Sequence, residues 1–395
     1  MGFRRASHPR RFPEKSLARE TSFSLARVSS DAHFKKALTF ALRTMSQKLI
    51  FEAVSGSAIM KFPTKTLLCL IASQAIAASA FAKNPPSVPP PKPGEAVTIY
   101  RAWKGQRFTL PDRWDKRFYA VKGYHGSADG AAIDPTQANG TNPQSGQGPH
   151  YKKIHKPKIY PSRANGLFQV GEASCSGFLI GRSMIMTAAH CVVDEYDYDW
   201  RDLSKAWFSP GLHLGEQELR ADQKLASQNI VHPYQKCGVK NAYVAKSYNS
   251  SAYAKRPRDY AFVLLDCHVG QTTGWLGLIF PPEDSAGISV MLRGYPARYQ
   301  NEPYFSLGKI LKIDPNGYTL FANTAGFSGF SGGSLIASSL NNKCSPSAKD
   351  RSQCAIGLLS SEFENQHIQY TKMNGPIIFH ALWFKNWADY VNPPK

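Results

Sequence analysis

The second half of the chain is dominated by short apolar runs, and this pattern constrains its fold more than any other feature. The runs are CSGFLIG, SMIMTAA, NIVHPY, YAFVLLD, ISVMLRGYP, GGSLIAS and CAIGLLSS, separated by glycine, proline, asparagine or serine. Short runs divided by turn residues are typical of strands in an all-β barrel or sandwich. Residues 164–395 are therefore predicted to form an all-β domain.

The last apolar segment has a different period. In IIFHALWFKNWADYV, Phe379, Trp383, Trp387 and Tyr390 recur at helical spacing. The segment is predicted to form an amphipathic helix whose aromatic side packs on the β body. A cofactor role for the aromatic stripe is the alternative, but we expect no cofactor.

The formal net charge of +20 is spread unevenly over the 395 residues. Residues 1–82 carry 13 Lys/Arg and 4 Asp/Glu, residues 83–163 carry 14 and 5, and residues 164–395 carry 21 and 19. Because the basic excess precedes the β-rich part, it indicates a leader or weak contact with acidic surfaces. We expect no specific nucleic-acid partner.

An export signal starts at Met60. The sequence MKFPTKTLLCLIASQAIAASAFAK has two lysines, an apolar run too short to span a bilayer, and an A-x-A cleavage sequence that ends at Ala82. A buried helix is the alternative. We interpret 1–59 as a basic extension outside the translated protein and 60–82 as a signal peptide. The protein is then periplasmic or secreted, with no membrane span.

The segment from 83 to 163 is interpreted as a leader or propeptide. It begins with the proline-rich KNPPSVPPPKPGE, and residues 126–149 are rich in glycine, alanine, asparagine and proline. The intervening VTIYRAWKGQRFTLPDRW has enough aromatic residues to be ordered. Arg163 is a candidate cleavage point ahead of the domain at 164–395.

Six cysteines remain once the signal is removed. An even number in an exported chain indicates disulfides, and six cysteines allow fifteen pairings. The simplest pairing joins neighbours in the sequence: Cys175–Cys191, Cys237–Cys267 and Cys344–Cys354.

A serine hydroxyl becomes a good nucleophile only when a base takes its proton and a third group orients that base. His190, in MIMTAAHCVV, is the candidate base: it follows a strand-like run, and a disulfide at Cys191 would pin it. A core histidine is the alternative. Asp259 opens the strand RDYAFVLLD and is the candidate third group, although it could also cap that strand.

The acidic residues between 194 and 202 are more typical of a solvated loop. They lack the glycine of a calcium-binding loop. We therefore predict no metal site.

Three motifs carry a family resemblance. TAAHC, RDYAFVLL and GFSGGS, in the order His…Asp…Ser, resemble the trypsin-like serine peptidases of the chymotrypsin fold, and this order differs from those of subtilisins and α/β-hydrolases. RGYP followed by the serine motif resembles the bacterial branch that includes glutamyl endopeptidases. The resemblance covers about residues 165 to 395 and implies two six-stranded antiparallel β-barrels with a C-terminal helix.

The resemblance also selects one serine in FANTAGFSGFSGGSLIA. The family motif is Gly-x-Ser-Gly-Gly, which fits Ser331 but not Ser328. It implies that Ser331 is the nucleophile, His190 the base and Asp259 the orienting acid. The backbone N–H groups of Gly329 and Ser331 would form the oxyanion hole.

Departures from the family pattern concern activation and specificity. Phe330 stands where many animal members have the aspartate that receives a new N-terminus, so we expect activation, if any, by removal of a covering leader. A preference for arginine or lysine needs an acidic residue six positions before Ser331, and that position holds Ala325. In GLLSSEF, Ser360 is expected to pair with substrate, and Glu362 would narrow the pocket and repel acidic side chains.

Together these features predict an exported, monomeric serine endopeptidase that acts on polypeptides. A catalytically inactive peptidase-fold protein, serving as a binding or scaffold protein of the cell envelope, is the main alternative. A basic envelope-binding protein that acts through its N-terminal segment is the other. Labelling with a fluorophosphonate separates these possibilities.

Overall fold

The structure of the protein is a computed structural model. It describes residues 92–112, 120–127, 151–194, 199–215, 229–248, 258–299, 302–314, 318–340, 353–362 and 368–393. The chain divides into two units, Met1–Lys83 and Asn84–Lys395, and every described residue belongs to the second. The predicted extension and signal peptide lie outside the described residues. Within the described part, none of the helices is both long and apolar enough for a membrane span.

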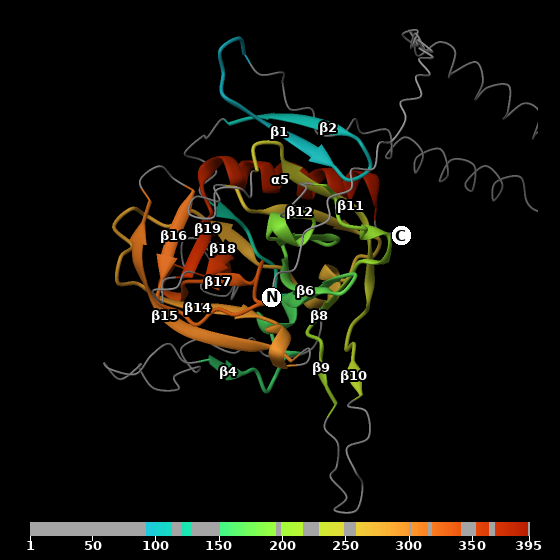
Figure 1. Cartoon of the computed structure of the whole chain (residues 1–395), viewed down its shortest axis with the longest axis vertical. Coiled ribbons are helices and arrows are strands. Elements are labelled where there is room, and N and C mark those ends of the chain that lie inside the picture. The colour runs from blue at the N-terminus through green and yellow to red at the C-terminus, as the bar shows by residue number, and fades with distance from the viewer. Residues whose placement is uncertain are drawn as a thin grey trace, which may run out of the picture. The chain divides into compact units, whose positions relative to one another are not determined.

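The first barrel is a closed ring of six antiparallel strands (Figure 1). Its strands are β5 (Asn165–Val170), β6 (Ala173–Leu179), β7 (Met184–Thr187), β8 (Trp207–Pro210), β11 (Cys237–Ala245) and β12 (Ala261–Leu265). They pair in the order β12-β7-β6-β5-β8-β11, and β11 pairs with β12 to close the ring. The apolar runs of the sequence therefore form a barrel, as predicted.

The second barrel closes in the same way. Its strands are β14 (Ser289–Gly294), β15 (Tyr304–Ile313), β16 (Thr319–Ala322), β17 (Ser334–Ile336), β18 (Cys354–Glu362) and β19 (Ile368–Lys372). The order is β17-β14-β15-β16-β19-β18, and β17 pairs with β18. The predicted pair of six-stranded antiparallel barrels is confirmed.

Shorter elements extend or connect the barrels. The strands are β1 (Val97–Ala102), β2 (Arg107–Pro111), β3 (Ala120–Val121), β4 (Tyr151–Lys153), β9 (His213–Leu214), β10 (Ile230–Val231) and β13 (Gly277–Ile279). The short helices are η3 (Ser162–Ala164), η4 (Ala189–Cys191), η5 (Leu203–Lys205), α3 (Gly270–Thr273), η6 (Ala297–Tyr299) and η7 (Ser338–Leu340). β1 pairs with β11 and β4 with β15, so both barrels have added edge strands.

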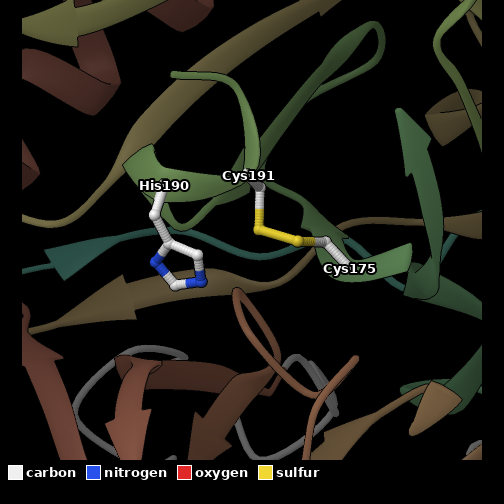
Figure 2. Close-up of side chains that lie close together, drawn as sticks. All are labelled: Cys175, His190 and Cys191. Carbon is white, nitrogen blue, oxygen red and sulfur yellow. A yellow bond between two sulfur atoms is a disulfide. The ribbon is translucent and has the colours of Figure 1, made fainter. Parts of the chain in front are cut away.

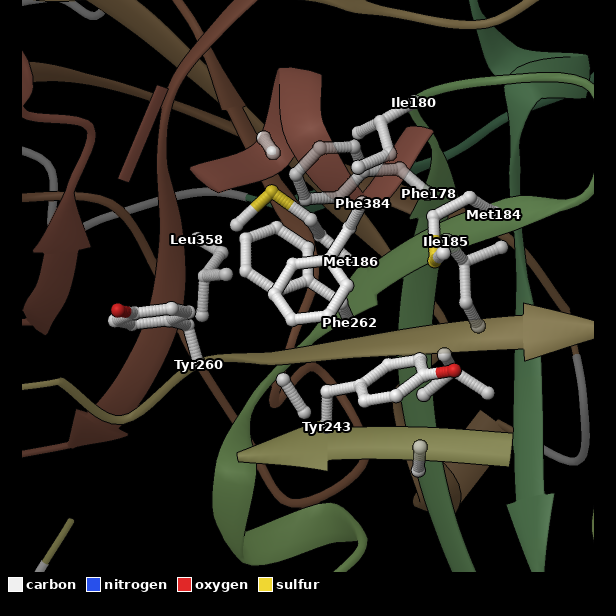
Figure 3. Close-up of a cluster of buried hydrophobic side chains, with 14 of the residues drawn as sticks. Phe178, Ile180, Met184, Ile185, Met186, Tyr243, Tyr260, Phe262, Leu358 and Phe384 are labelled. Atoms are coloured by element: carbon white, nitrogen blue, oxygen red, sulfur yellow. The ribbon is translucent and has the colours of Figure 1, made fainter. Parts of the chain in front are cut away.

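The predicted C-terminal helix is α5 (Gly375–Val391). The Asn374 side chain caps it by accepting a hydrogen bond from the Ile377 N–H. Its buried side is centred on Phe384, whose ring lies 4.8 Å from that of Phe262 and 4.6 Å from that of Tyr243 (Figure 3). Fully burying each such side chain contributes about 1.5–3 kcal/mol.

The predicted aromatic stripe of α5 lies at the flank of this buried side. Phe379, Trp383 and Trp387 are half-buried, and Tyr390 is exposed. Trp383 and Trp387 stack on each other and pack edge-on against Phe108 of β2. The stripe therefore contacts the N-terminal hairpin as well as the barrel, which the sequence alone did not indicate.

The described part of 83–163 is packed into the same body as the barrels. Tyr100, Ala102, Leu110 and Val121 belong to the main core and are at most 5% exposed. Arg163 is 1% exposed and donates to the carbonyl oxygens of three residues, Thr273, His125 and Lys158. Removal of 83–163 stays a prediction, and it would uncover these core side chains.

Two disulfides agree with the neighbour pairing. Cys175 is bonded to Cys191, and Cys237 to Cys267. Cys354 is also disulfide-bonded. Because Cys344 lies outside the described residues, its pairing with Cys354 stays a prediction.

Candidate active site

His190 lies in η4, a short 3-10 helix of one turn that follows β7. Ala188 and Ala189 are fully buried beside it, and Cys191 ties the turn to Cys175 on β6 (Figure 2). The imidazole itself is 13% exposed. The small residues and the disulfide therefore fix the backbone while the ring keeps access to solvent.

Asp259 precedes β12, and its carboxylate holds His190 at two points. Oδ2 lies 2.9 Å from His190 Nδ1, and Oδ1 accepts a hydrogen bond of 3.1 Å from the His190 backbone N–H. The carboxylate is fully buried, where only hydrogen-bonded or paired charges are tolerated. A carboxylate acceptor at Nδ1 places the proton there and leaves Nε2 with its lone pair free.

The second barrel also supports Asp259. The Ser360 hydroxyl on β18 donates to Asp259 Oδ2 at 2.5 Å, and the Thr371 hydroxyl on β19 donates to the Asp259 carbonyl at 2.9 Å. Ser360 was predicted to pair with substrate, and that role stays a prediction. The contact of its side chain with the acid had no signal in the sequence.

Ser331 lies in a glycine-rich turn ahead of β17. Its carbonyl accepts a hydrogen bond of 2.8 Å from the Ser176 N–H on β6, and Cys191 Sγ lies 3.9 Å from the same oxygen. Gly332 has φ +81°, and a Cβ there would meet Thr187 Oγ1 and lie 2.8 Å from Ala188 N. The turn is thus packed directly against the residues that precede His190.

The Ser331 hydroxyl and His190 Nε2 are not hydrogen-bonded to each other in the described part of the chain. Such bonds are often long until substrate is bound. The structure therefore brings the histidine and the acid into direct contact, and it brings the serine turn into contact with the backbone beside the histidine.

Within the part of the chain that the structure describes, the predicted oxyanion-hole donors have no acceptor. Within the described residues, the N–H groups of Phe330, Gly332 and Gly333 donate to backbone carbonyls, whereas those of Gly329 and Ser331 do not. Gly329 has φ +93°, which favours glycine, and a Cβ there would collide with Ala297 N. Two such donors on one turn are the kind of groups that an oxyanion hole needs.

Ser176 is a site residue that the sequence did not reveal. Its hydroxyl donates to the Gly329 carbonyl at 2.7 Å and accepts from the Tyr295 N–H at 2.8 Å. Its carbonyl accepts from the Thr187 hydroxyl. It thus fixes the Gly329 peptide from the opposite barrel. A serine within the apolar run CSGFLIG was the one available signal.

The residues predicted to set specificity are only partly described. Ala325 is 5% exposed, and a Cβ at neighbouring Gly326 would lie 3.1 Å from the side chains of both Leu359 and Ile368. The side chains that surround Gly326 are therefore apolar. Glu362 ends β18 and pairs with Ile368, but its side chain lies outside the described residues.

Phe330, the departure from the aspartate of many animal members, is fully buried. A Cβ at Gly294 would lie 2.6 Å from its ring, so glycine is needed there to accommodate the phenylalanine. Position 330 thus offers an apolar contact and no carboxylate.

Metal ligation has little support among the described residues. The two groups with suitable spacing are Cys175, His190, Cys191 and Cys237, Asp266, Cys267. In both, the sulfurs are joined in disulfides, and zinc binding needs thiolates. In the acidic loop, Asp194 pairs with Arg201 and Asp202 caps η5.

The trypsin family model matches residues 152–311, which include His190 and Asp259. No curated protein sequence matches the chain. Similar solved structures include a Glu endopeptidase, with 18% identity, a TM-score of 0.48, and coverage of 61% of this chain and 98% of that one. The protease Anisep from Arthrobacter nicotinovorans has 19% identity and a TM-score of 0.38, and the match covers 53% of this chain and 90% of that one. Human heparin binding protein has 16% identity and a TM-score of 0.39, and the match covers 62% of this chain and 97% of that one.

The structure contains a pair of closed six-stranded barrels, and the turn that carries His190 lies between β7 and β8 of the first barrel. Residues 152–311 match the trypsin family model, and the pair of closed barrels has the arrangement expected from the resemblance to trypsin-like peptidases.

Proposed function

We propose that the protein is a serine endopeptidase that hydrolyses peptide bonds in polypeptides with Ser331, His190 and Asp259. The observation that carries the proposal is the buried Asp259 carboxylate, which holds the ring and the backbone of His190 at once. The packing of the Ser331 turn on the residues before His190 supports it.

The mechanism uses each group at a defined atom. His190 Nε2 takes the proton of Ser331 Oγ as that oxygen attacks the peptide carbonyl carbon. Asp259 stabilises the imidazolium through Nδ1–H, and the free N–H groups of Gly329 and Ser331 bind the tetrahedral oxyanion. His190 then protonates the leaving amine. Water, deprotonated by the same nitrogen, hydrolyses the acyl-enzyme and regenerates the serine.

We propose a preference for an apolar side chain before the scissile bond. The support is the apolar contact of Leu359 and Ile368 at Gly326, together with Ala325 at the position expected for a basic-specific anchor. The sequence leads us to expect that Glu362 repels acidic side chains, so we do not propose glutamyl specificity.

We further propose that the enzyme is exported through the signal at 60–82 and acts as a monomer in the periplasm or outside the cell. The disulfides Cys175–Cys191 and Cys237–Cys267 support an oxidising compartment. Mass spectrometry of the native protein should find no peptides from 1–59. Such peptides would contradict translation from Met60.

The test is labelling of the purified protein with a fluorophosphonate, followed by peptide mapping. The wild type should be labelled at Ser331, and Ser331→Ala should not be labelled. Ser328→Ala is the matched control, because Ser328 is an exposed serine in the same Gly-Phe-Ser-Gly frame and should leave labelling unchanged. An unlabelled wild type would support the inactive scaffold instead. A peptide-library digest then gives the specificity.

A further inference from the structure

The contacts of Asp259 continue away from the active site into the N-terminal hairpin. Tyr260, the next residue, is 1% exposed, and its hydroxyl lies 2.7 Å from that of Tyr100 on β1. The Tyr100 hydroxyl lies 2.8 Å from His380 Nδ1 on α5, and His380 Nε2 lies 3.2 Å from the carbonyl oxygen of Pro111 on β2. All of these side chains are buried.

The acceptors in this chain settle the direction of every hydrogen bond. The Pro111 carbonyl can only accept, so His380 Nε2 carries the ring proton and Nδ1 accepts from the Tyr100 hydroxyl. The Tyr100 oxygen is then left to accept from the Tyr260 hydroxyl. Burial raises the pKa of both phenols and lowers that of His380 to about 4, which matches neutral groups in this arrangement.

The residue on the other side of Asp259 is tied to the same hairpin. Arg258 has φ +72°, the one positive φ of a non-glycine residue among those described, and such a conformation needs external support. Its guanidinium donates to Ser247 Oγ at 2.6 Å and Tyr318 OH at 3.2 Å. It also lies 3.8 Å from Asp112 Oδ2, just after β2.

The hairpin itself is bound to the barrel by backbone and by aromatic packing. β1 pairs with β11 from Tyr100 to Ala102. The Tyr100 ring lies 5.0 Å from that of Phe384, and the Phe108 ring lies 5.3 Å from that of Trp383. Figure 1 shows β1 and β2 alongside α5. A leader that dissociates would have to break a sheet and expose these rings.

We propose that Tyr100 is a positioning residue for Asp259, and that the β1–β2 hairpin is a permanent part of the working enzyme. The hairpin fixes Tyr260 on one side of the acid and Arg258 on the other, so it sets the direction in which Asp259 meets His190. Any processing of the N-terminus then falls before Val97 and not at Arg163. This inference rests on the proposed function.

The first test is the Tyr100→Phe variant of the full chain. Tyr260 then loses its acceptor, and the strand start that holds Asp259 relaxes. We expect kcat for a peptide substrate to fall about tenfold with KM within about twofold, because small misplacement of a catalytic group lowers the rate of the chemical step. Tyr243→Phe is the matched control, since Tyr243 is as buried and also packs on Phe384. It should retain wild-type kcat.

The second test asks whether Tyr100 acts through the acid. The rate constant for fluorophosphonate labelling is measured for wild type, Tyr100→Phe, Asp259→Asn and the double variant. The Tyr100→Phe effect should shrink to within about twofold in the Asp259→Asn background, as expected for coupled residues. An equal effect in both backgrounds indicates a general structural role and overturns the proposal.

The third readout is the N-terminal sequence of the active protein isolated from its native host. We expect it to begin before Val97. A labelled enzyme that begins after residue 112 would overturn the hairpin's role while leaving the proposed function intact. An unlabelled wild type would overturn the proposed function, and the role of Tyr100 with it.

Discussion

Asp259 and the turn that carries Ser331 are held in different ways. Asp259 accepts hydrogen bonds from the side chains of His190 in the first barrel and of Ser360 and Thr371 in the second. The residues that flank it are bonded to the hairpin. The Ser331 turn is held mainly by backbone contacts, which are possible because Gly329 and Gly332 have no Cβ. Hydrogen bonds from side chains therefore position Asp259, whereas mainly backbone hydrogen bonds and close steric fit position the Ser331 turn.

Removing the charge of the acid should have the largest effect. Asp259→Asn keeps the shape of the side chain but favours the wrong imidazole tautomer, and we expect kcat to fall about 10⁴-fold. Steady-state hydrolysis of a peptide substrate measures it. Asp266→Asn, at the other end of β12 and exposed, is the control and should stay near wild type. A loss of less than tenfold would be incompatible with the proposed role of Asp259.

Steric disruption of the serine turn should come next. A Cβ at Gly332 would collide with Thr187 and Ala188, so Gly332→Ala should displace Ser331 and lower kcat/KM by about 10² or more. Gly287→Ala is a matched control because Gly287 also has a positive φ, at +83°, but has open space around its Cβ position. The comparison fails if both variants lose the same activity.

A single donor to the acid should have a smaller effect. Ser360→Ala removes one hydrogen bond to the buried carboxylate, and a bond to a charged group is worth about 1.5–3 kcal/mol, so we expect kcat/KM to fall roughly ten- to a hundredfold. Ser361→Ala removes a hydroxyl bonded to Gln369 instead and should change little. Equal kinetics for the two variants would show that Ser360 does not support Asp259.

The buried hydrogen bond between Tyr100 and His380 should make the free energy of unfolding depend on pH. Burial lowers the pKa of His380 to about 4, below its value of about 6.5 in an unfolded chain, so the unfolded state takes up the proton first. The contribution of neutral His380 to the free energy of unfolding is thus complete above pH 6.5. It is lost as the pH falls towards 4, which lowers the free energy of unfolding by about 2–3 kcal/mol. Calorimetry of wild type and His380→Gln measures this, and the variant should show a shallower slope. An identical dependence of stability on pH in wild type and variant would contradict a neutral, buried His380.

Local patterns predicted an all-β body, the C-terminal helix and two disulfides, whereas the pair of six-stranded barrels was implied by the family resemblance. Runs of strand residues, helical spacing and neighbouring cysteines are visible within short windows. His190 and Asp259 were predicted from motifs, and the structure brings them together.

What the sequence did not show depends on distant partners. The hydroxyls of Tyr100 and Tyr260 are separated by 160 positions, and Tyr100 is 280 positions from His380. The strands β1 and β2 stand between proline-rich and low-complexity segments, so composition favoured a leader. Ser176 and Thr371 are ordinary strand residues whose importance comes only from what they face in the folded protein.

The contact between Tyr100 and His380 joins β1, the first strand among the described residues, to α5, the last helix among them. The chain must therefore be synthesised through α5 before the hydrogen bonds that support Asp259 can form. Under the proposed export and peptidase function, partly synthesised or unfolded chains would lack this support of Asp259, and the producing cell would be spared digestion of its own proteins until folding is complete.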